Sequence, residues 1–274
     1  MRVRGRAKAF AAVTLAAAGA CAGFAPPAAD QIRVLVYNIH AGKDAGGADN
    51  LSRVAEVVRD SRADFVLLQE VDRFTTRSGK VDQLAVLDSL TGYNGAFGRT
   101  LDYQGGQYGI AILSRWSITS DTLIHLPIDP PQQRAGGSYE PRGALRVVIK
   151  SSHGTVGVLN THLDPSRDDH YRRQEIATIL ALFQSVAEST RLAFAGGDLN
   201  SEPGSAVLEA ISSAGLSDSW RECGKGDGFS YPADKPVKRI DYLILPRTLR
   251  CASARVIDTQ ASDHRPVLFI VAER

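Results

Sequence analysis

Short apolar segments recur along this chain, and turns that contain glycine separate many of them. Residues 32–38 (IRVLVYN) and 65–71 (FVLLQEV) show the pattern, because apolar side chains fill each segment and polar ones stand near its end. Apolar runs of this length between turn residues predict buried β-strands. We expect strands at residues 32–38, 65–71, 108–114, 144–150, 155–161, 192–195, 240–245 and 267–271.

Other segments have helical periodicity. Asn50 is a suitable N-cap residue, and Leu51, Val54 and Val58 after it fall on one face of a helix. Because strands outnumber helices, the sequence predicts an α/β protein with large mixed or antiparallel sheets whose outer faces are covered by helices. The pattern does not set the strand order. Further helices are expected over residues 83–89, 168–186 and 206–212.

The N-terminal segment differs from the rest. Four basic residues between positions 2 and 8 precede an apolar stretch, residues 9–20, that is too short and alanine-rich for a permanent membrane helix. This pattern favours a secretory signal peptide ending in Ala18-Gly19-Ala20. Cys21 follows directly, so the alternative is a bacterial lipoprotein signal with lipidation of Cys21. We divide the chain into a signal (residues 1–20), a linker (21–31) and one domain (32–274).

Charge and cysteine content limit the function and the compartment. The whole chain has a formal charge of +2, but without residues 1–20 it has 28 Lys and Arg against 30 Asp and Glu. The excess positive charge therefore belongs to the signal and is no evidence of nucleic-acid binding. Two cysteines remain after Cys21. Cys223 and Cys251 form one disulfide in an oxidising compartment or remain unpaired, and the sequence leaves both open.

Polar residues follow or end several of the predicted strands. A polar residue inside an apolar run needs a partner, since burying it unpaired costs a few kcal/mol. Several such residues at the ends of different strands indicate that those ends meet at one polar site. Carboxylates, amides and imidazoles without cysteine favour a hard divalent cation, Mg²⁺ or Mn²⁺. The residues are Asn38, Glu70, His162, Asp198, Asn200, Asp241, Asp263 and His264.

The motifs around these residues occur in an order that resembles the endonuclease/exonuclease/phosphatase superfamily. They are YNIHAGKD, LLQEVD, YGIAILSR, LNTHLDP, GGDLNSEPG, RIDYLIL and SDHRPV, and they span about residues 32–272. The superfamily includes deoxyribonuclease-I-like nucleases, abasic-site endonucleases, inositol-phosphate 5-phosphatases and neutral sphingomyelinases. The resemblance implies a four-layer α/β/β/α sandwich, with two stacked mixed β-sheets flanked by helices and the active site at one edge.

The resemblance also implies a metal site and a catalytic base. Glu70 would be the main metal carboxylate, with Asn38 beside it and Asp263 completing the coordination. A Mg²⁺ ion held by few protein ligands keeps waters and has room for a phosphate oxygen. Asp198 would orient and deprotonate the attacking water, and Asn200 would donate to a phosphoryl oxygen or hold Asp198 without adding negative charge.

Two histidines receive roles by the same resemblance. His264 would stabilise the charge that builds up on the phosphorus centre, with Asp241 fixing its tautomer. His162 would contact a phosphate oxygen or protonate the leaving group. His40 would line the pocket, with a purely structural imidazole as the alternative. Arg142 would meet a substrate anion, with a surface arginine as the alternative.

One position departs from the resemblance. Many relatives have Asn after the glycine of the YG strand, whereas this chain has Ile110, which weakens inference of the substrate by analogy. We expect an exported, monomeric phosphoesterase in a secreted, periplasmic or cell-envelope lipoprotein form, bound to a membrane only through a lipidated Cys21. The expected substrate is a small or lipid-headgroup phosphodiester or phosphomonoester. The alternatives are a secreted nuclease acting on DNA or RNA and, more remotely, a non-catalytic surface binding module.

Overall fold

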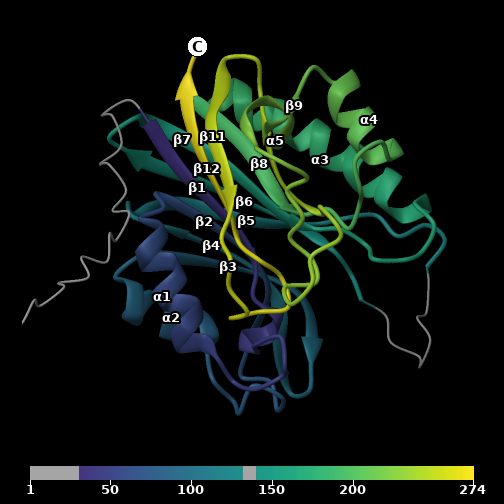
Figure 1. Ribbon diagram of the computed structural model, residues 1–274. Helices are drawn as coiled ribbons and strands as arrows, with labels where there is room; N and C mark the ends of the chain where they lie inside the picture. The colour runs from purple at the N-terminus through teal and green to yellow at the C-terminus, as the bar shows by residue number, and fades with distance from the viewer. Residues whose placement is uncertain (1–30, 132–139) are drawn as a thin grey trace, which may run out of the picture.

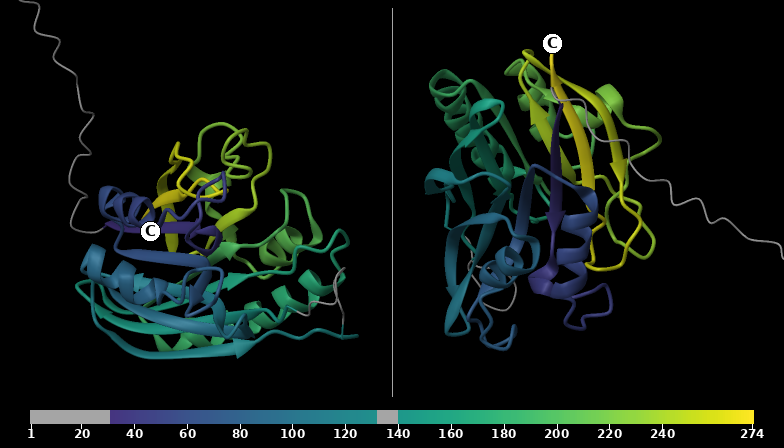
Figure 2. Two further views of the ribbon diagram at one scale, coloured as in Figure 1. Left: turned by 90° about the horizontal axis from the view of Figure 1, so that it is seen from below. Right: turned by 90° about the vertical axis from the view of Figure 1, so that its left-hand side faces the viewer.

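The computed structural model describes residues 31–131 and 140–274. The predicted signal peptide, Cys21 and nearly all of the predicted linker lie outside the described residues. Within them, two six-stranded sheets lie face to face. The left-hand view of Figure 2 shows the purple and blue strands of one sheet over the teal strands of the other.

The first sheet has the strand order β11-β12-β1-β2-β4-β3. Its two central strands, β1 and β2, are parallel, and its other pairings are antiparallel, so the sheet is mixed. The strands are β1 (Gln31–Asn38), β2 (Phe65–Arg73), β3 (Asn94–Tyr103), β4 (Gly106–Ser114), β11 (Leu249–Val256) and β12 (Val267–Glu273).

The second sheet has the order β5-β6-β7-β8-β10-β9 and is also mixed, because only β7 and β8 run parallel. A short 3-10 helix, η1 (His40–Gly42), follows β1. The strands are β5 (Ile118–His125), β6 (Gly143–Ser151), β7 (Gly154–His162), β8 (Leu192–Asp198), β9 (Ser217–Asp218) and β10 (Asp241–Leu245).

Helices cover the outer face of each sheet, as Figure 1 shows with α1 and α2 on one side and α3 and α4 on the other. Side chains of α1 and α2 pack with Leu35 and Val66 of the first sheet, while those of α3 and α4 pack with Leu159 and Ala195 of the second. A third apolar cluster lies between the sheets. The predicted four-layer sandwich is confirmed. The helices are α1 (Leu51–Ser61), α2 (Gln83–Thr91), α3 (His170–Ser189), α4 (Ala206–Ser213) and α5 (Ser219–Cys223).

The strands that the sequence did not predict are the outermost ones, namely β11 and β3 in the first sheet and β5 and β9 in the second. An edge strand has a neighbour on one side only and is partly exposed, so its apolar pattern is weak. Residues 119–122 of β5 (TSDT) are all exposed and polar. Predicted N-cap Asn50 does precede α1, but its side chain makes no capping hydrogen bond.

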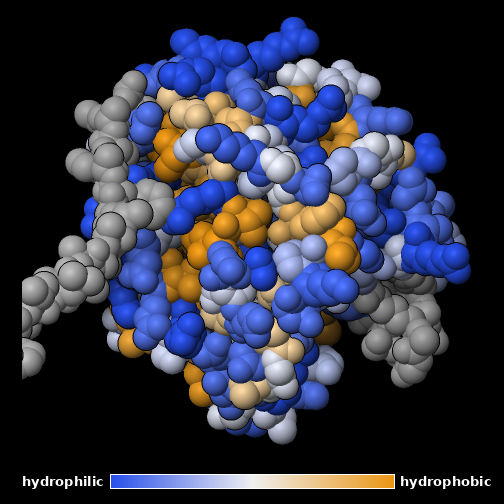
Figure 3. Space-filling view, in the orientation of Figure 1, coloured by the Kyte–Doolittle hydropathy of each residue, from blue (hydrophilic) through white to orange (hydrophobic). Residues whose placement is uncertain are grey.

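Cys223 at the end of α5 and Cys251 on β11 form a disulfide. Of the two alternatives that the sequence left open, the structure therefore has the bonded one. No helix among the described residues is long and apolar enough to cross a membrane. On the face drawn in Figure 3, hydrophilic side chains cover most of the surface and apolar ones gather near its middle.

Candidate active site

The predicted site residues come from both sheets and meet at one edge of the sandwich. Asn38 ends β1 and Glu70 lies in β2 of the first sheet, while His162, Asp198 and Asp241 stand at ends of β7, β8 and β10 in the second. A cavity of about 750 Å³ opens there. Its lining includes Glu70, Arg142, His162, Asp198, Asn200, Asp263 and His264.

A bulge in β2 directs Glu70 toward this cavity. The pairing of β2 with β4 loses its register between Leu68 and Val71, and Glu70 has a φ of 58°, in the left-handed region. A non-glycine residue in this conformation costs about 1–3 kcal/mol, and such strain is concentrated at functional sites. Bulges re-aim side chains next to active sites in many sheets. The backbone therefore places the carboxylate of Glu70 where a regular strand would not.

Asn38 joins Glu70 to Asp198. Its side-chain Nδ2 donates to Glu70 Oε1 at 3.0 Å and to Asp198 Oδ2 at 3.1 Å. The backbone N–H of His40 donates to Asn38 Oδ1 at 3.1 Å, which fixes the orientation of the amide. Asn38 is fully buried, and its two hydrogen bonds hold the carboxylates of Glu70 and Asp198 close together. In this orientation the nitrogen faces Glu70, while Oδ1, which accepts from His40, keeps a second lone pair that could ligate a cation.

Asp198 is positioned by strand pairing on both sides. It lies opposite His162 in the parallel β7–β8 ladder and opposite Asp241 in the antiparallel β8–β10 ladder. Gly197 allows the close approach of β7, because its φ is 137° and a Cβ there would lie 1.9 Å from the carbonyl oxygen of Thr161. The strand therefore needs glycine at the residue that precedes the carboxylate.

Asn200 follows Asp198 in a left-handed conformation, with a φ of 47°. Its backbone N–H donates to Asp198 Oδ1 at 2.9 Å, and its side-chain Nδ2 donates to the carbonyl oxygen of Leu163 at 2.9 Å. Of the two roles expected for Asn200, the structure shows contact with Asp198, and the backbone makes it.

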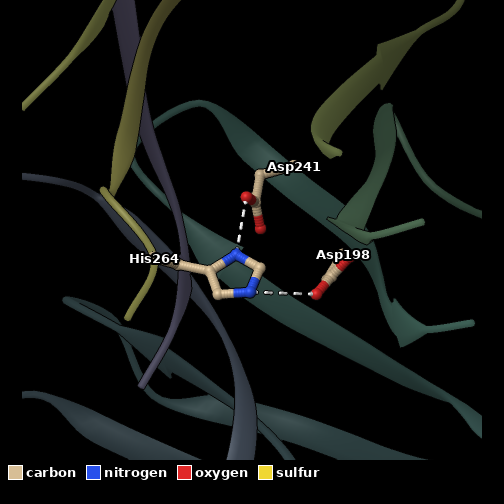
Figure 4. Close-up of side chains that lie close together, drawn as sticks. All are labelled: Asp198, Asp241 and His264. Atoms are coloured by element: carbon tan, nitrogen blue, oxygen red, sulfur yellow. Dashed lines mark hydrogen bonds and ion pairs between the residues drawn. The ribbon is translucent and has the colours of Figure 1, made fainter. Parts of the chain in front are cut away.

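His264 lies between two carboxylates (Figure 4). Its Nδ1 is 2.9 Å from Asp241 Oδ2, and its Nε2 is 3.6 Å from Asp198 Oδ2. Two residues that the sequence did not single out complete this arrangement. The Ser230 hydroxyl donates to Asp241 Oδ2 at 2.5 Å, and the Tyr231 ring packs on the imidazole with centroids 4.7 Å apart. Both come from a loop without periodic pattern, so no sequence signal marked them.

Burial and neighbouring charges set the protonation of this pair. Burial raises the pKa of Asp198 to about 7, and Asp241 adds to the rise, while His264 and the N–H donors of Asn200 and Asn38 lower it. Burial lowers the pKa of His264, but the charge and hydrogen bond of Asp241, together with the charges of Asp198 and Asp263, outweigh burial and raise it to about 10. His264 is therefore cationic at neutral pH, and Asp198 has the pKa of an effective general base.

The Nδ1 atom of His162 has a different neighbour from that of His264. Its Nε2 lies 3.5 Å from Asp198 Oδ2, as the Nε2 of His264 does at a similar distance, but its Nδ1 lies 3.1 Å from Nη1 of Arg142. Arg142 is only 2% exposed, and it pairs with Glu140 at 3.0 Å. The alternative of a surface arginine is therefore wrong. The guanidinium lines the cavity and contacts His162.

The residues present fit a hard cation, because the carboxylates of Glu70 and Asp263 line the same cavity. Divalent Mg²⁺ and Mn²⁺ prefer such oxygen ligands. The Asp263 side chain is 27% exposed, and His40 Nδ1 lies 3.9 Å from its Oδ1. His40 is not among the described residues that line the cavity, and its ring lies beside Asp263.

A second candidate cation site is formed by Asp198, Asp241 and His264, whose ligand atoms lie within 4.8 Å of one another. Its atoms already bond one another. His264 Nδ1 carries the proton shared with Asp241, and Asp241 Oδ2 also accepts from Ser230. A hard cation also prefers oxygen ligands to an imidazole nitrogen. The oxygen ligands of Glu70 and Asp263 therefore fit a cation better.

Ile110, the position that departs from the resemblance, does not line the cavity. It is 2% exposed and belongs to the apolar cluster between the sheets. Any polar substrate contact must come from other residues around the cavity.

Comparison with known proteins agrees with this geometry. The model of the Endonuclease/Exonuclease/phosphatase family matches residues 35–264. An endonuclease/exonuclease/phosphatase from Beutenbergia cavernae is similar in structure, with a TM-score of 0.73 and 21% identity over 89% of this chain and 72% of that one. A mannosyl-6-phosphatase from Bacteroides thetaiotaomicron has a TM-score of 0.71 and 19% identity, over 88% of this chain and 99% of that one.

The catalytic domain of human Nocturnin, with bound sulfate, has a TM-score of 0.68 and 19% identity, over 89% of this chain and 94% of that one. Likeness at these identities establishes the fold. The family model goes further, because it matches most of the chain and includes every residue described above as part of the site. The chain belongs to the endonuclease/exonuclease/phosphatase family, whose members are divalent-metal-dependent phosphoric ester hydrolases.

Proposed function

We propose that this chain is an exported phosphoesterase that uses Mg²⁺ or Mn²⁺ to hydrolyse a P–O bond of a small or lipid-headgroup phosphate ester by direct attack of water. The observation that carries the proposal is the shared hydrogen-bond donor of Glu70 and Asp198. Both carboxylates accept from Nδ2 of Asn38, at 3.0 and 3.1 Å, although they are distant in sequence. A metal carboxylate and a base therefore stand side by side.

Different residues of the cavity have different roles in the proposed hydrolysis. Glu70 and Asp263 would hold the cation, which supplies charge stabilisation for the phosphoryl oxygens. Asp198 takes the proton of the attacking water, and the N–H groups of Asn38 and Asn200 fix its orientation. The cationic ring of His264, held by Asp241, stabilises negative charge that develops on the phosphoryl group.

The charges around the cavity support a small substrate. Its lining includes five basic residues, but also five carboxylates, so it is not a cationic groove of the kind that follows a nucleic-acid backbone. The basic residues are Arg77, Arg142, Arg167, Arg172 and Lys238, and the carboxylates are Glu70, Glu140, Asp198, Glu202 and Asp263.

One observation favours the nuclease alternative. Tyr103, Tyr108 and Tyr231 also line the cavity, and bases stack on such rings. Tyr108 is only 7% exposed, which leaves Tyr103 and Tyr231 as the accessible rings. The mannosyl-6-phosphatase among the similar structures makes a sugar phosphate a further substrate to test.

Export is supported by the basic and apolar pattern of residues 1–20 and by the disulfide between Cys223 and Cys251. Disulfides persist in oxidising compartments and are rare in the cytosol. We expect a monomer that is secreted, periplasmic or tethered to the envelope through a lipidated Cys21. Mass spectrometry of the exported protein reads its N-terminus, and an unmodified Cys21 would contradict the tether.

A substrate panel tests the proposed activity. Purified protein with Mg²⁺ or Mn²⁺, and with excess chelator, is given bis(p-nitrophenyl) phosphate, mannose 6-phosphate, phospholipid vesicles, plasmid and single-stranded DNA. We expect metal-dependent release from small or lipid esters that Asp198→Ala abolishes, while the same change at exposed Asp121 leaves it intact. Rapid DNA degradation with no release from the other substrates would establish the nuclease instead. Equal background rates with wild-type and Asp198→Ala protein would indicate a binding module.

A further inference from the structure

The two histidines of the cavity have opposite chemical groups behind them. Both present Nε2 to the same oxygen, Asp198 Oδ2, at 3.5 Å for His162 and 3.6 Å for His264. Behind His264, Nδ1 meets the carboxylate of Asp241 at 2.9 Å. Behind His162, Nδ1 meets the guanidinium of Arg142 at 3.1 Å. The two imidazoles therefore lie at similar distances from Asp198 but differ in the group at Nδ1, which sets the protonation of each ring.

The guanidinium determines which nitrogen of His162 carries the proton. Arginine has N–H donors and no acceptor, so a hydrogen bond from Arg142 requires a lone pair on Nδ1 of His162. The ring proton is then on Nε2. Arg142 remains charged, because burial lowers its pKa but the Glu140 carboxylate at 3.0 Å, together with Tyr108, Glu175 and Glu70, raises it by more in total. At His264 the opposite holds, since a carboxylate accepts and Nδ1 must carry a proton.

A second proton on His162 is disfavoured by the same contact. Protonation at Nδ1 would break the hydrogen bond and place an imidazolium beside a guanidinium, with both side chains almost fully buried. Like charges at this distance in a poorly solvated site repel strongly. Without that second proton, His162 could act as an acid only by becoming an anion.

We propose that Arg142 is a positioning residue that fixes His162 as a neutral donor at Nε2, so that His162 hydrogen-bonds a phosphoryl oxygen and does not protonate the leaving group. This inference rests on the proposed phosphoesterase function. In the step, water forms the new P–O bond and gives its proton to Asp198, while the electron pair of the breaking P–O bond leaves with the departing oxygen. That oxygen takes its proton from solvent, and His162 keeps its own. Of the two roles expected for His162, the hydrogen bond is assigned.

The tautomer is measured directly by NMR, independently of activity. Long-range ¹H–¹⁵N correlation of ¹⁵N-histidine-labelled protein at neutral pH separates protonated from unprotonated ring nitrogens, and His162→Gln assigns the signal. We expect protonated Nε2 and unprotonated Nδ1 in the wild type. In Arg142→Met we expect a form with protonated Nδ1 to appear. Arg77→Met removes another cavity arginine, one that pairs with Asp72 at 2.7 Å, and should leave the His162 signal unchanged.

The wild-type spectrum alone decides the structural part, even if Arg142→Met does not fold. A protonated Nδ1 on His162 in the wild type overturns the proposal. The same result in Arg142→Met as in the wild type also overturns it, because the tautomer would then be set by another group.

Leaving-group dependence tests the chemical part. The kcat/KM for a series of methyl aryl phosphates, from p-nitrophenol to phenol as the leaving group, is compared for wild type and His162→Ala. We expect all esters to lose rate by about the same factor, about 10²–10³, as for loss of one phosphoryl-oxygen donor. A loss that grows with the basicity of the leaving group would show general-acid catalysis by His162 and overturn the proposal. If no ester is hydrolysed at all, the proposed function fails while the NMR result still stands.

Discussion

Replacing Glu175 with glutamine should change the pH dependence of stability. Glu175 lies on α3 with no exposed surface, and its Oε2 accepts a hydrogen bond from the backbone N–H of Asp164 at 2.9 Å. Burial raises the pKa of Glu175 from 4.5 to about 7 and the charge of Asp164 adds to the rise, while the hydrogen bond from the Asp164 N–H and the charges of Arg142 and Arg172 lower it. This buried acid therefore keeps its proton up to about neutral pH.

The sign and size of the effect follow from proton linkage. Below pH 4.5 the group is protonated in both states, and its contribution to stability is fully present. Between pH 4.5 and about 7 the unfolded chain ionises first, so stability falls as the pH rises. Each pKa unit is worth about 1.4 kcal/mol, which makes the total loss about 3 kcal/mol. Glutamine does not titrate, so Glu175→Gln removes this loss.

Urea unfolding of both proteins between pH 4.5 and 8 measures the effect. We expect the stability of Glu175→Gln relative to wild type to increase by about 3 kcal/mol across this range, with most of the change below pH 7. Glu188→Gln is the matched control, because Glu188 is exposed on the same helix, and its difference from wild type should stay within about 0.5 kcal/mol. Parallel stability curves for wild type and Glu175→Gln would show that Glu175 has no raised pKa in the folded protein.

Three further predictions concern the active site and the disulfide. Asp241→Asn removes the charge that keeps His264 cationic, so kcat on bis(p-nitrophenyl) phosphate should fall about 10²–10³-fold in steady-state assays. An unchanged kcat would show that His264 needs no charged partner. Chelation should abolish hydrolysis and added Mn²⁺ or Mg²⁺ restore it, whereas activity that persists in excess chelator would exclude a metal mechanism. Replacing Cys223 and Cys251 together with alanine should lower the free energy of unfolding by about 2–4 kcal/mol in urea titrations, and reduction of the wild type should do the same. Equal stability of the oxidised and reduced wild type would contradict this last expectation.

The sequence predicted the central strands well and the edge strands poorly, for a physical reason. A strand such as β2 is buried on both faces and between two neighbours, so apolar residues fill it and mark it. The edge strand β5 is exposed along residues 119–122, where its backbone pairs with β6, and a polar sequence allows that pairing.

In the candidate site, too, some residues could be predicted from the sequence and others could not. Glu70 and Asp198 could be identified because each is a carboxylate beside a buried apolar run. The shared contact with Asn38 that brings them together depends on how two sheets stack, which no local pattern records. Ser230 and Tyr231 contact Asp241 and His264 from an irregular loop, and only the folded chain reveals them.

The location of the cation is the most direct test of the proposed metal site. Crystals of the protein soaked in Mn²⁺ give an anomalous difference map that marks the ion without reference to activity. We expect a peak bonded to the carboxylates of Glu70 and Asp263, with Asp198 beside it and free of the metal. A peak held jointly by Asp198, Asp241 and His264, or no peak in the cavity at saturating Mn²⁺, would contradict this expectation.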